Sequence, residues 1–339
     1  MITDASVLQK GFVPDDSIHR NREVTALSRS LDPLTRGHIP DPVLLTGPSG
    51  AGKTTFTRFV VNQLEASAPE TQAVHVNCWE SHTRSGALFD ALESLQVATA
   101  LHRNSTSHDE LLNHLAAIDK PVVLILDEVD QLDDTSLIYD CYATAGVTTI
   151  LITNDRGELL REMDDRVRSR LQTADHIHFD AYTSQQLADI LQARVDHGLV
   201  ADAISEPQLL EIGDAAAGDA RVALSILRTA AQTAAYNDRT TITTSDITDA
   251  IPRGKQSVRV RTLDSLREPQ QELFRLLQAT GETAPGELYE EFAATRSDPP
   301  TKRTVRSWLQ KLAHYNLVEY SGEGPTRTYT PVRDAPQAV

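Results

Sequence analysis

The sequence predicts an α/β fold with a parallel sheet, then a small all-helical domain, then a C-terminal unit of three helices and a hairpin. Three observations predict it. Strand and helix patterns alternate from about residue 44 to residue 179, which is typical of a parallel sheet covered on both faces. A glycine-rich loop separates the first strand pattern from the first helix pattern. After residue 181 no strand pattern recurs until two short alternating segments near the C-terminus.

The glycine-rich loop, Gly47–Thr54, has the spacing G-x-x-x-x-G-K-[ST]. A short apolar strand pattern precedes it and a helix pattern, Thr54–Ala66, follows it. Glycines let successive backbone N–H groups point at an anion, and the helix N-terminus adds positive potential. A plain glycine-rich turn is the alternative, but all four fixed positions and both flanking elements are present. The loop therefore predicts a bound nucleoside triphosphate.

Within this loop, Lys53 is expected to reach the β- and γ-phosphates, and the Thr54 hydroxyl to hold Mg²⁺. The other residues of the loop are expected to contribute mainly backbone groups. The full set expected to contact ATP or ADP here is Gly47, Gly50, Ala51, Gly52, Lys53, Thr54 and Thr55.

The third strand pattern ends in two carboxylates. Val122–Leu126 is apolar throughout, as a strand buried on both faces should be. It delivers Asp127 towards Mg²⁺ and places Glu128 to polarise an attacking water, which are the parts that phosphoryl transfer needs. An apolar strand that ends in two carboxylates is weak evidence for a nucleotide site by itself. It becomes strong evidence when it follows a glycine-rich phosphate-binding loop, or P-loop. The expected strands are Val43–Thr46, Ala73–Asn77, Val122–Leu126, Val147–Thr153 and His176–Phe179.

The composition excludes several classes of protein. The 339 residues exceed one ordinary core, so two or three domains are expected. No apolar stretch is long enough to cross a membrane, and no signal-peptide pattern begins the chain. Cys78 and Cys141 have no C-x-x-C spacing, so neither a disulfide framework nor a zinc site is expected. His176 and His178 alternate along a strand without a third ligand. A cytoplasmic protein without a membrane partner is expected.

The charge is strongly negative, −16 at pH 7, with 48 acidic residues against 26 Arg and 6 Lys. This composition resembles that of proteins from salt-loving archaea. At such salt concentrations the Debye length is a few ångströms, so the net charge says little about local docking. The C-terminal stretch 262–339 is nearly balanced, with 9 cations against 11 acids. The acidic excess therefore lies away from that stretch.

Helix patterns fill the rest of the chain. A small helical domain is expected from Thr183–His197, Glu206–Ala217, Ala220–Tyr236 and Thr244–Ala250. The segment 251–261 carries four cations and no acid, and it is interpreted as a linker. The last unit combines three helix patterns, Glu268–Gln278, Pro285–Ala294 and Lys302–His314, with a hairpin from Leu317–Tyr320 and Arg327–Thr330. Three helices and a hairpin are the winged-helix pattern.

These patterns divide the chain into four parts. Residues 1–180 form the nucleotide-binding α/β domain, residues 181–252 the helical lid, residues 253–262 a basic linker and residues 263–335 the winged helix.

Taken in order, the motifs resemble an AAA+ ATPase, and specifically the archaeal ORC/CDC-type replication-initiator family. The resemblance covers nearly the whole chain. The P-loop differs from the usual family sequence at Pro48, Ser49 and Ala51, which leaves nucleotide binding intact and allows slow hydrolysis. The other segments that carry the resemblance are Phe12–Pro14, His19–Glu23, Val76–Cys78, Thr83–Arg84, Leu126–Leu132, Asp165–Leu171 and Gly218–Arg221.

The resemblance implies further roles in the nucleotide site. Asn154 matches the sensor-1 position, where an amide orients the lytic water, although a turn residue at a strand end would look the same. Arg221 matches sensor 2, where a guanidinium contacts the γ-phosphate; a solvated helix arginine is the alternative. Tyr182 and Arg194 match lid positions that contact nucleotide, with an ordinary helix-start tyrosine and a surface cation as the alternatives.

An arginine finger that acts on the nucleotide of a neighbouring molecule is implied for Arg166 or Arg170, which share a helix face. A salt-bridged surface patch is the alternative. The choice between the two arginines stays open.

Duplex DNA is expected to meet two regions. No acid occurs from Pro299 to Val318, and the helix within this stretch offers Lys302, Arg303 and Arg306 to phosphates or base edges. Arg327 in the hairpin is placed for a minor groove. The family also uses an inserted element of the ATPase domain against DNA, where Arg84 is the candidate. A solvated face on a protein-binding wing is the alternative.

The resemblance implies an ATP-dependent initiator that recognises double-stranded origin DNA and helps load a replicative helicase of the MCM type. Hydrolysis is expected to be slow and switch-like, and self-association on DNA is expected. Two alternatives remain: a regulatory paralogue that binds DNA without hydrolysing ATP, and a clamp-loader-like AAA+ remodeller.

Overall fold

The computed structural model describes residues 1–9, 12, 18–99, 101–103, 105–333 and 335–336. The expected Phe12–Pro14 segment lies mostly outside these residues. The chain divides into two compact units. We call Gln9–Ile190 with Ala217–Ala220 the sheet unit, and Met1–Leu8 with Leu191–Ala216 and Arg221–Val339 the helical unit.

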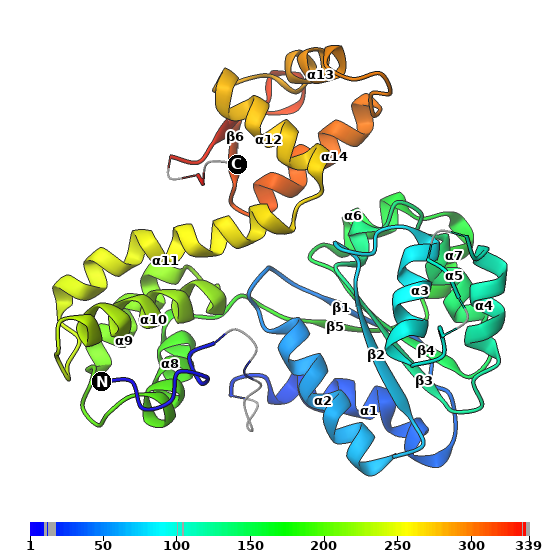
Figure 1. Cartoon of the computed structure of the whole chain (residues 1–339), viewed down its shortest axis with the longest axis horizontal. Helices are drawn as coiled ribbons and strands as arrows, with labels where there is room; N and C mark the ends of the chain where they lie inside the picture. Colours follow the sequence, from blue (N-terminus) through cyan, green and yellow to red (C-terminus); the bar gives the residue numbers. More distant parts are fainter. Residues whose placement is uncertain (10–11, 13–17, 100, 104, 334, 337–339) are drawn as a thin grey trace. The chain divides into compact units, whose positions relative to one another are not determined.

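The sheet unit is built on five parallel strands in the order β2-β3-β4-β1-β5 (Figure 1). All five expected strands are confirmed, each within one residue of its expected bounds. Because the strands are parallel, the carboxyl ends of β1, β3 and β4 lie along one edge of the sheet. Their bounds are β1 Val43–Thr46, β2 Gln72–Asn77, β3 Val122–Asp127, β4 Val147–Ile152 and β5 Asp175–His178.

Two hydrophobic cores lie on the two faces of this sheet. Along β3, Leu124 and Leu126 belong to one core, while Val123 and Ile125 belong to the other. This alternation explains why the whole strand is buried and why Val122–Leu126 is apolar throughout. The first core contains side chains of α3 Arg84–Ser94, α4 His108–Ala116, α5 Ser136–Ala143, α6 Arg156–Glu162 and α7 Asp165–Leu171. The second contains side chains of α1 Asn21–Leu31, the 3-10 helix η1 Asp32–Arg36 and α2 Lys53–Ser67.

The helical unit begins with a helix bundle. The division between the two units falls inside α8 Ser184–Gly198. Three helices were predicted to within one residue of their observed ends. They are α8, α9 Glu206–Ala216 and α10 Ala220–Tyr236. A capping box between Thr243 and Asp246 starts the next helix, α11 Thr244–Ser265. Hydrogen bonds from Arg239 hold the pKa of the Asp246 carboxyl well below its usual range.

The expected linker at 253–262 is wrong as a secondary-structure prediction, because α11 runs through it without interruption. Pro252 and Gly254 both lie inside the helix. A Cβ at Gly254 would lie 2.6 Å from Cγ1 and 2.9 Å from the backbone N of Ile226. The glycine therefore permits close packing of α11 on α10, and it does not end the helix.

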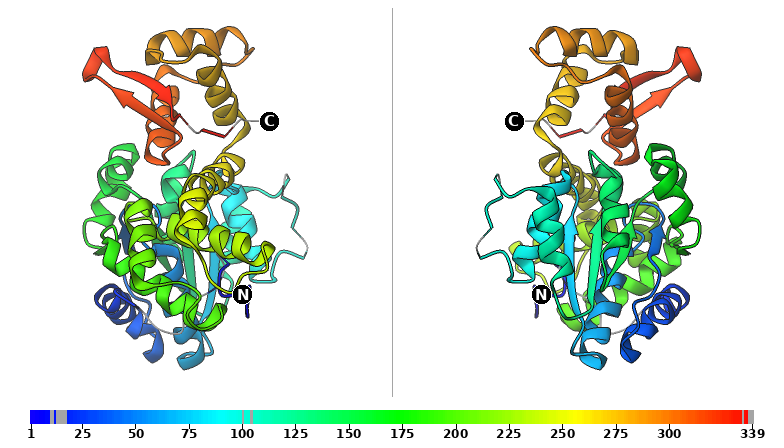
Figure 2. Two further views of the ribbon diagram at one scale, coloured as in Figure 1. Left: turned by 90° about the vertical axis from the view of Figure 1, so that its left-hand side faces the viewer. Right: turned by 90° about the vertical axis from the view of Figure 1, so that its right-hand side faces the viewer.

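The C-terminal part has the winged-helix order. It comprises α12 Glu268–Thr280, α13 Pro285–Ala294, α14 Lys302–His314, β6 Val318–Ser321, the 3-10 helix η3 Gly324–Thr326 and β7 Thr328–Pro331. The strands β6 and β7 pair antiparallel, and Thr283 forms a bridge to Tyr329. Figure 2 shows this hairpin projecting from the three helices. Phe274, Phe292 and Leu309 are among the buried residues that close its core.

In the described part of the chain, no helix combines the length and the apolar character that a membrane crossing needs.

Candidate functional site

The glycine-rich loop joins the end of β1 to the start of α2 in the sheet unit. Gly47, Gly50 and Gly52 have φ angles of 138°, 77° and 97°, a region that other residues adopt only with strain. A Cβ at Gly47 would overlap the carbonyl oxygen of Phe179, and one at Gly50 would overlap the carboxylate of Asp219. The glycines are therefore required both by the backbone conformation and by close neighbours. Ala51 is buried, and Thr55, in the first turn of α2, is half-buried.

Lys53 is buried beneath this loop. Its ammonium donates to the carbonyl oxygens of Gly47 at 2.6 Å and Pro48 at 3.0 Å, and to Oδ1 of Asn154 at 2.9 Å. A buried ammonium is costly unless it is hydrogen-bonded. These acceptors hold the positive charge at the mouth of the loop, where an anion would meet it.

Thr54 and Asp127 connect the start of α2 to the end of β3. The Thr54 hydroxyl donates to Oδ2 of Asp127 at 2.7 Å, and Nε2 of His75 lies 3.0 Å from the same oxygen. The other carboxylate oxygen, Oδ1, is buried and has no hydrogen-bond partner among the described residues. A buried acceptor of this kind is the ligand that Mg²⁺ or its bound water prefers. The expected Mg²⁺ pair, Thr54 and Asp127, therefore fits the ion.

Glu128 and Asn154 meet at the same edge of the sheet. The amide of Asn154 donates to Oε2 of Glu128 at 2.8 Å, while its carbonyl accepts from Lys53. Glu128 has a left-handed backbone, φ 55° and ψ 47°, which is uncommon for a residue with a side chain. This turn directs the chain away from β3 immediately after Asp127. Lys53, Asn154 and Glu128 thus form one hydrogen-bonded row.

Buried hydrogen bonds next to this row connect the segments that follow β3 and β4. The hydroxyl of Thr153 donates to Oδ1 of Asp130 at 2.9 Å, and Gln131 donates to Oδ2 at 2.8 Å. All three side chains are buried. Because Thr153 directly precedes Asn154, this hydrogen bond fixes the position of the Asn154 amide relative to Glu128.

Tyr182, for which a nucleotide contact is predicted, lies against the start of α2. Its hydroxyl would be 2.8 Å from a Cβ placed on Gly52. The guanidinium of Arg20 lies 3.9 Å from the centre of the Tyr182 ring, and its Nε donates to the carbonyl oxygen of Ala51 at 3.1 Å. Burial raises the pKa of the Tyr182 phenol. Arg20 therefore holds the loop in place through Ala51 and packs against Tyr182.

The segment Gly218–Ala220 packs on the same loop. The N–H of Ala220 donates to the carbonyl oxygen of Gly50 at 3.2 Å, and the N–H of Tyr182 donates to that of Gly218 at 3.3 Å. Arg221 follows directly in the chain but belongs to the helical unit. Arg194 also belongs to the helical unit, where it is buried and donates to the carbonyl oxygen of Val7 at 3.0 Å. Burial lowers the pKa of Arg194 to about 10. The nucleotide contacts expected of Arg194 and Arg221 stay predictions.

The expected DNA contact of Arg84 does not agree with its environment. Its guanidinium donates to Asp134 at 3.2 Å and to Asp140 at 2.5 Å, and it lies 2.8 Å from Nε2 of His108. These partners come from α4, α5 and the loop before α5. Arg84 thus joins elements of the sheet unit, and we do not carry it into a DNA interface.

The three arginines of α7 differ in their surroundings. Arg168 pairs with Asp165, and the guanidinium of Arg170 lies 5.3 Å from the centre of the Tyr142 ring. Arg166 is exposed, and among the described residues it forms no ion pair.

The cations expected to face DNA lie on the winged helix. Lys302, Arg303 and Arg306 are exposed on α14, whereas Leu309 and Leu312 are buried. Lys302 is 3.5 Å from Glu290. Arg327 of the hairpin lies 4.7 Å from the centre of the Tyr320 ring, which is 56% exposed.

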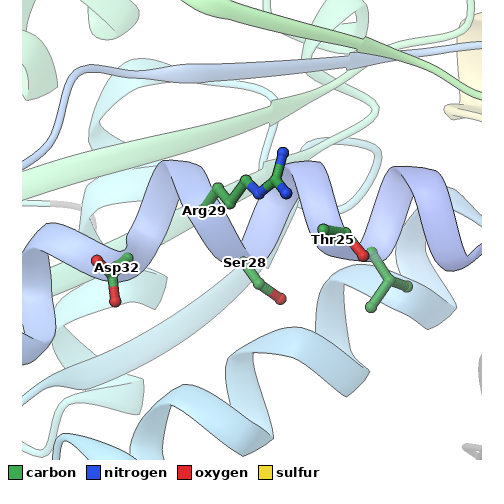
Figure 3. A pocket seen from close by; sticks show the side chains of 5 residues that line it. Thr25, Ser28, Arg29 and Asp32 are labelled. Carbon is green, nitrogen blue, oxygen red and sulfur yellow. The ribbon is translucent and has the colours of Figure 1, made fainter.

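Two further features carry no chemistry. No group of three or more His, Cys, Asp or Glu side chains among the described residues is arranged to hold a metal ion. A shallow surface depression beside α1 is lined by Val24, Thr25, Ser28, Arg29 and Asp32 (Figure 3). All five come from one helix segment, so no second element supplies a converging group.

Comparisons with known proteins identify the family of the chain. Residues 40–156 match the family model of an AAA domain, and residues 188–252 match that of a Cdc6 AAA+ ATPase-type lid domain. A Halobacterium salinarum protein described as ORC1-type DNA replication protein 9 is 41% identical over the whole chain and 96% of its own length. The chain belongs to the ORC1-type DNA replication protein family. A second member from this organism, ORC1-type DNA replication protein 1, is 43% identical over 91% of the chain and all of its own length.

Solved structures show the same fold. The Aeropyrum pernix ORC1 protein in complex with DNA matches 99% of this chain and 94% of its own, with a TM-score of 0.75 and 24% identity. The Aeropyrum pernix ORC2 protein, solved as ADPNP–ADP complexes, matches 99% and 95% with a TM-score of 0.66 and 21% identity. This family therefore accounts for the order of an AAA+ core, a lid and a winged helix.

Sequence reasoning missed two residues of the site. Arg20 was seen only as part of a family segment, and His75 only as a strand residue. His75 is at position four of β2, paired in register with Ile125, two residues before Asp127. The alternation of β2 puts His75 and Asn77 on the same face, which was the available signal.

We predict that His75→Phe weakens Mg²⁺-dependent nucleotide binding about tenfold or more, because partners that orient a metal ligand typically contribute that much. Phenylalanine keeps a ring in place and removes the nitrogen that holds Asp127. The measurement is a fluorescent-nucleotide titration with Mg²⁺ and with EDTA. His75→Gln, which retains a donor, is the matched control. Equal losses of affinity with Mg²⁺ and with EDTA would contradict a role through Asp127.

Proposed function

We propose that this family member is an ATP-dependent DNA replication initiator. It binds ATP or ADP with Mg²⁺, hydrolyses ATP slowly, holds double-stranded origin DNA and helps load a replicative helicase of the MCM type. It acts in the cytoplasm on the nucleoid. The observation that carries the proposal is the meeting of Lys53, Thr54, Asp127, Glu128 and Asn154 at one sheet edge, in a chain that ends in a winged helix.

The nucleotide would bind with its phosphates against the N–H groups of the glycine-rich loop. Lys53 would exchange the carbonyl oxygens of Gly47 and Pro48 for phosphate oxygens, which are charged and therefore stronger acceptors. Mg²⁺, held through Thr54 and Asp127, would neutralise phosphate charge when bound. Glu128 and Asn154 already share a hydrogen bond, so the pair is placed to orient a water for attack.

The lid would report the state of the nucleotide. Ala220 donates to the loop carbonyl of Gly50, and Arg221 is the next residue. We assign the γ-phosphate contact to this arginine, which the resemblance identifies as sensor 2. Loss of that phosphate would release the guanidinium and with it the start of α10.

Two relatives support the ligands of this proposal. The solved structure of the Aeropyrum pernix ORC2 protein contains ADPNP and ADP, and that of the ORC1 protein contains DNA. This chain has the same fold over nearly its whole length.

We predict that Lys53→Ala lowers ATP affinity at least about 100-fold, because it removes a charge-assisted contact to two phosphates and leaves loop carbonyls unpaired. Glu128→Gln should keep ATP affinity and lose hydrolysis. Equilibrium dialysis and phosphate release measure the two effects. Lys120→Ala, which removes an exposed lysine paired only with Glu70, is the control. Retained ATP affinity in Lys53→Ala would refute the nucleotide site.

The DNA-binding element is the exposed face of α14. Arg303 and Arg306 are three residues apart and therefore share a face. In the described part of the chain neither has an ion-pair partner, whereas Lys302 lies near Glu290 and Tyr289. Arg327, stacked on the exposed Tyr320, extends the positive surface to the hairpin. We therefore assign the main phosphate or base contacts to Arg303 and Arg306.

Arg303→Gln with Arg306→Gln should lower duplex affinity and flatten its salt dependence. Each lost phosphate contact reduces the slope of log K against log salt by about 0.9, so we expect a reduction of about 1.8. Fluorescence anisotropy over a KCl series gives the slope. Arg22→Gln with Arg58→Gln makes the same charge change on α1 and α2, and it should leave the slope unaltered. An unchanged slope in the first variant would move the DNA site off α14.

Self-association would place Arg166 against the nucleotide of a neighbouring copy. Arg166 is the α7 arginine that is exposed and unpaired among the described residues, whereas Arg168 and Arg170 are engaged. An arginine finger must be available to a partner, and it adds charge stabilisation that one subunit cannot supply alone.

We predict that Arg166→Ala abolishes the concentration-dependent part of the ATPase rate while retaining ATP affinity. Mixing Arg166→Ala with Lys53→Ala protein should restore part of the rate, because an intact loop in one copy then meets an intact finger in the other. Phosphate release on DNA is the readout, and Arg168→Ala is the control. Loss of the rate in Arg170→Ala, with Arg166→Ala active, would assign the finger to Arg170 instead.

A further inference from the structure

The carboxylate of Asp219 lies directly on the glycine-rich loop. A Cβ built on Gly50 would be 2.0 Å from Oδ1 and 2.9 Å from Oδ2 of Asp219. Gly50 has a φ of 77°, and the carboxylate takes the space that a side chain at this glycine would need. Both residues belong to the sheet unit. An anionic group therefore covers one face of the loop whose N–H groups are expected to bind phosphate.

The backbone on either side of Asp219 is held against the same part of the molecule. The N–H of Ala220 donates to the carbonyl oxygen of Gly50 at 3.2 Å, so residues 219 and 220 both contact this glycine. On the other side, Gly218 has a φ of 87°, and its carbonyl oxygen accepts from the N–H of Tyr182 at 3.3 Å. Asp219 itself is half-buried. The position of the carboxylate is therefore tied to the backbone of the segment Gly218–Ala220.

Asp219 also stands directly before a helix, because α10 begins at Ala220. At this position Asp, Asn and Ser are preferred, since their side chains accept hydrogen bonds from the first N–H groups of the helix. Asn serves there about as well as Asp does. The start of α10 therefore explains a short polar side chain at position 219, but it does not require a negative charge.

The charge of Asp219 opposes that of two cations on the same loop. The ammonium of Lys53 and the guanidinium of Arg20 donate to carbonyl oxygens of the loop, and both charges favour a bound phosphate. The carboxylate of Asp219 does the reverse, because like charges repel, and they repel more strongly in a partly buried site than in water. A bound ADP or ATP would bring several negative charges to this loop. Asp219 therefore lowers the affinity that the loop and its cations provide.

We propose that Asp219 speeds the release of nucleotide by repelling the bound phosphates, and so positions the start of α10 according to whether the loop is occupied. The proposal rests on the proposed function, because it concerns the same nucleotide site. Phosphates in the loop push the carboxylate away from Gly50, and with it the segment Gly218–Ala220 from which α10 starts. Departure of the nucleotide lets this segment return to its contacts with the loop.

The test compares Asp219→Asn with the wild type in the full-length protein. Asn keeps a hydrogen-bonding group before α10 and removes the charge. The measurement is stopped-flow dissociation of a fluorescent ADP analogue with Mg²⁺, at about 0.1 M and about 1 M KCl, where the Debye length is about 10 Å and about 3 Å. At the lower salt concentration we expect dissociation to slow by about fivefold, the factor for two unit charges at short range in water. At the higher concentration the difference from the wild type should shrink.

Two matched variants complete the test. Asp109→Asn makes the same charge change at an exposed position in the first turn of α4, and it should leave dissociation unaltered. Asp219→Ser removes the charge and keeps a residue preferred before a helix, so it should slow dissociation as Asp219→Asn does, and it replaces that variant if the latter fails to fold. Unchanged dissociation in both Asp219 variants, or a change of equal size at both salt concentrations, overturns the proposal.

Further outcomes distinguish this proposal from its alternatives. Faster dissociation in Asp219→Asn, together with a lower thermal midpoint, would show that the carboxylate only holds its segment on the loop, and would overturn the repulsion. If neither the wild type nor Lys53→Ala protein binds ADP, the proposed function itself is wrong. If the wild type binds ADP, Lys53→Ala protein does not, and Asp219→Asn releases ADP at the wild-type rate, only this inference falls.

Discussion

The hydrogen bond between Thr54 and Asp127 is the contact on which the rest of the site depends. It joins the start of α2 to the end of β3, and the two residues are 73 positions apart in the chain. Parallel strands make this meeting possible, because the carboxyl ends of β1, β3 and β4 all lie at one edge. The glycine-rich loop leaves β1 at that edge, and Glu128 and Asn154 follow β3 and β4 there. Without the parallel order, these residues would lie at opposite ends of the sheet.

The row from Lys53 through Asn154 to Glu128 connects the start of α2 with the ends of β4 and β3. A buried ammonium and a carboxylate are linked by one amide that donates to the carboxylate and accepts from the ammonium. Binding of a phosphate would draw Lys53 towards the new charge and leave the amide with one fixed partner. The hydrogen bond between Thr153 and Asp130 would keep the Asn154 amide in position during this exchange. The site therefore changes by exchanging hydrogen bonds, with no need to rebuild the strands.

The sequence was a good guide where a local pattern decides the structure. The five strands were predicted almost to the residue, because β1 and β3 begin with apolar runs, Val43–Leu45 and Val122–Leu126, and polar residues follow these runs. The prediction of a linker at 253–262 was wrong. Proline and glycine disfavour a helix locally, but packing of Gly254 on Ile226 favours continuation of α11 through this segment. His75 and Arg20 were missed because their partners are distant in the chain: Asp127 is 52 residues from His75, and Ala51 is 31 residues from Arg20. Arg84 was assigned to DNA from its place in an element that the family uses against DNA, and sequence alone did not show that Asp134 and Asp140 pair with it.

Electrostatics reconciles an acidic chain with a polyanionic ligand. A net charge of −16 would repel DNA at low salt, but at about 1 M salt charges more than about 3 Å beyond contact are largely screened. Under these conditions only cations that touch phosphate contribute, and acids elsewhere on the surface cost little. Exposed arginines without an ion-pair partner among the described residues, such as Arg303 and Arg306 on α14, would then make the phosphate contacts. Arginines paired with carboxylates, such as Arg84 and Arg239, instead hold the fold together. The pairing of each arginine, more than the total charge, therefore decides whether it serves binding or stability.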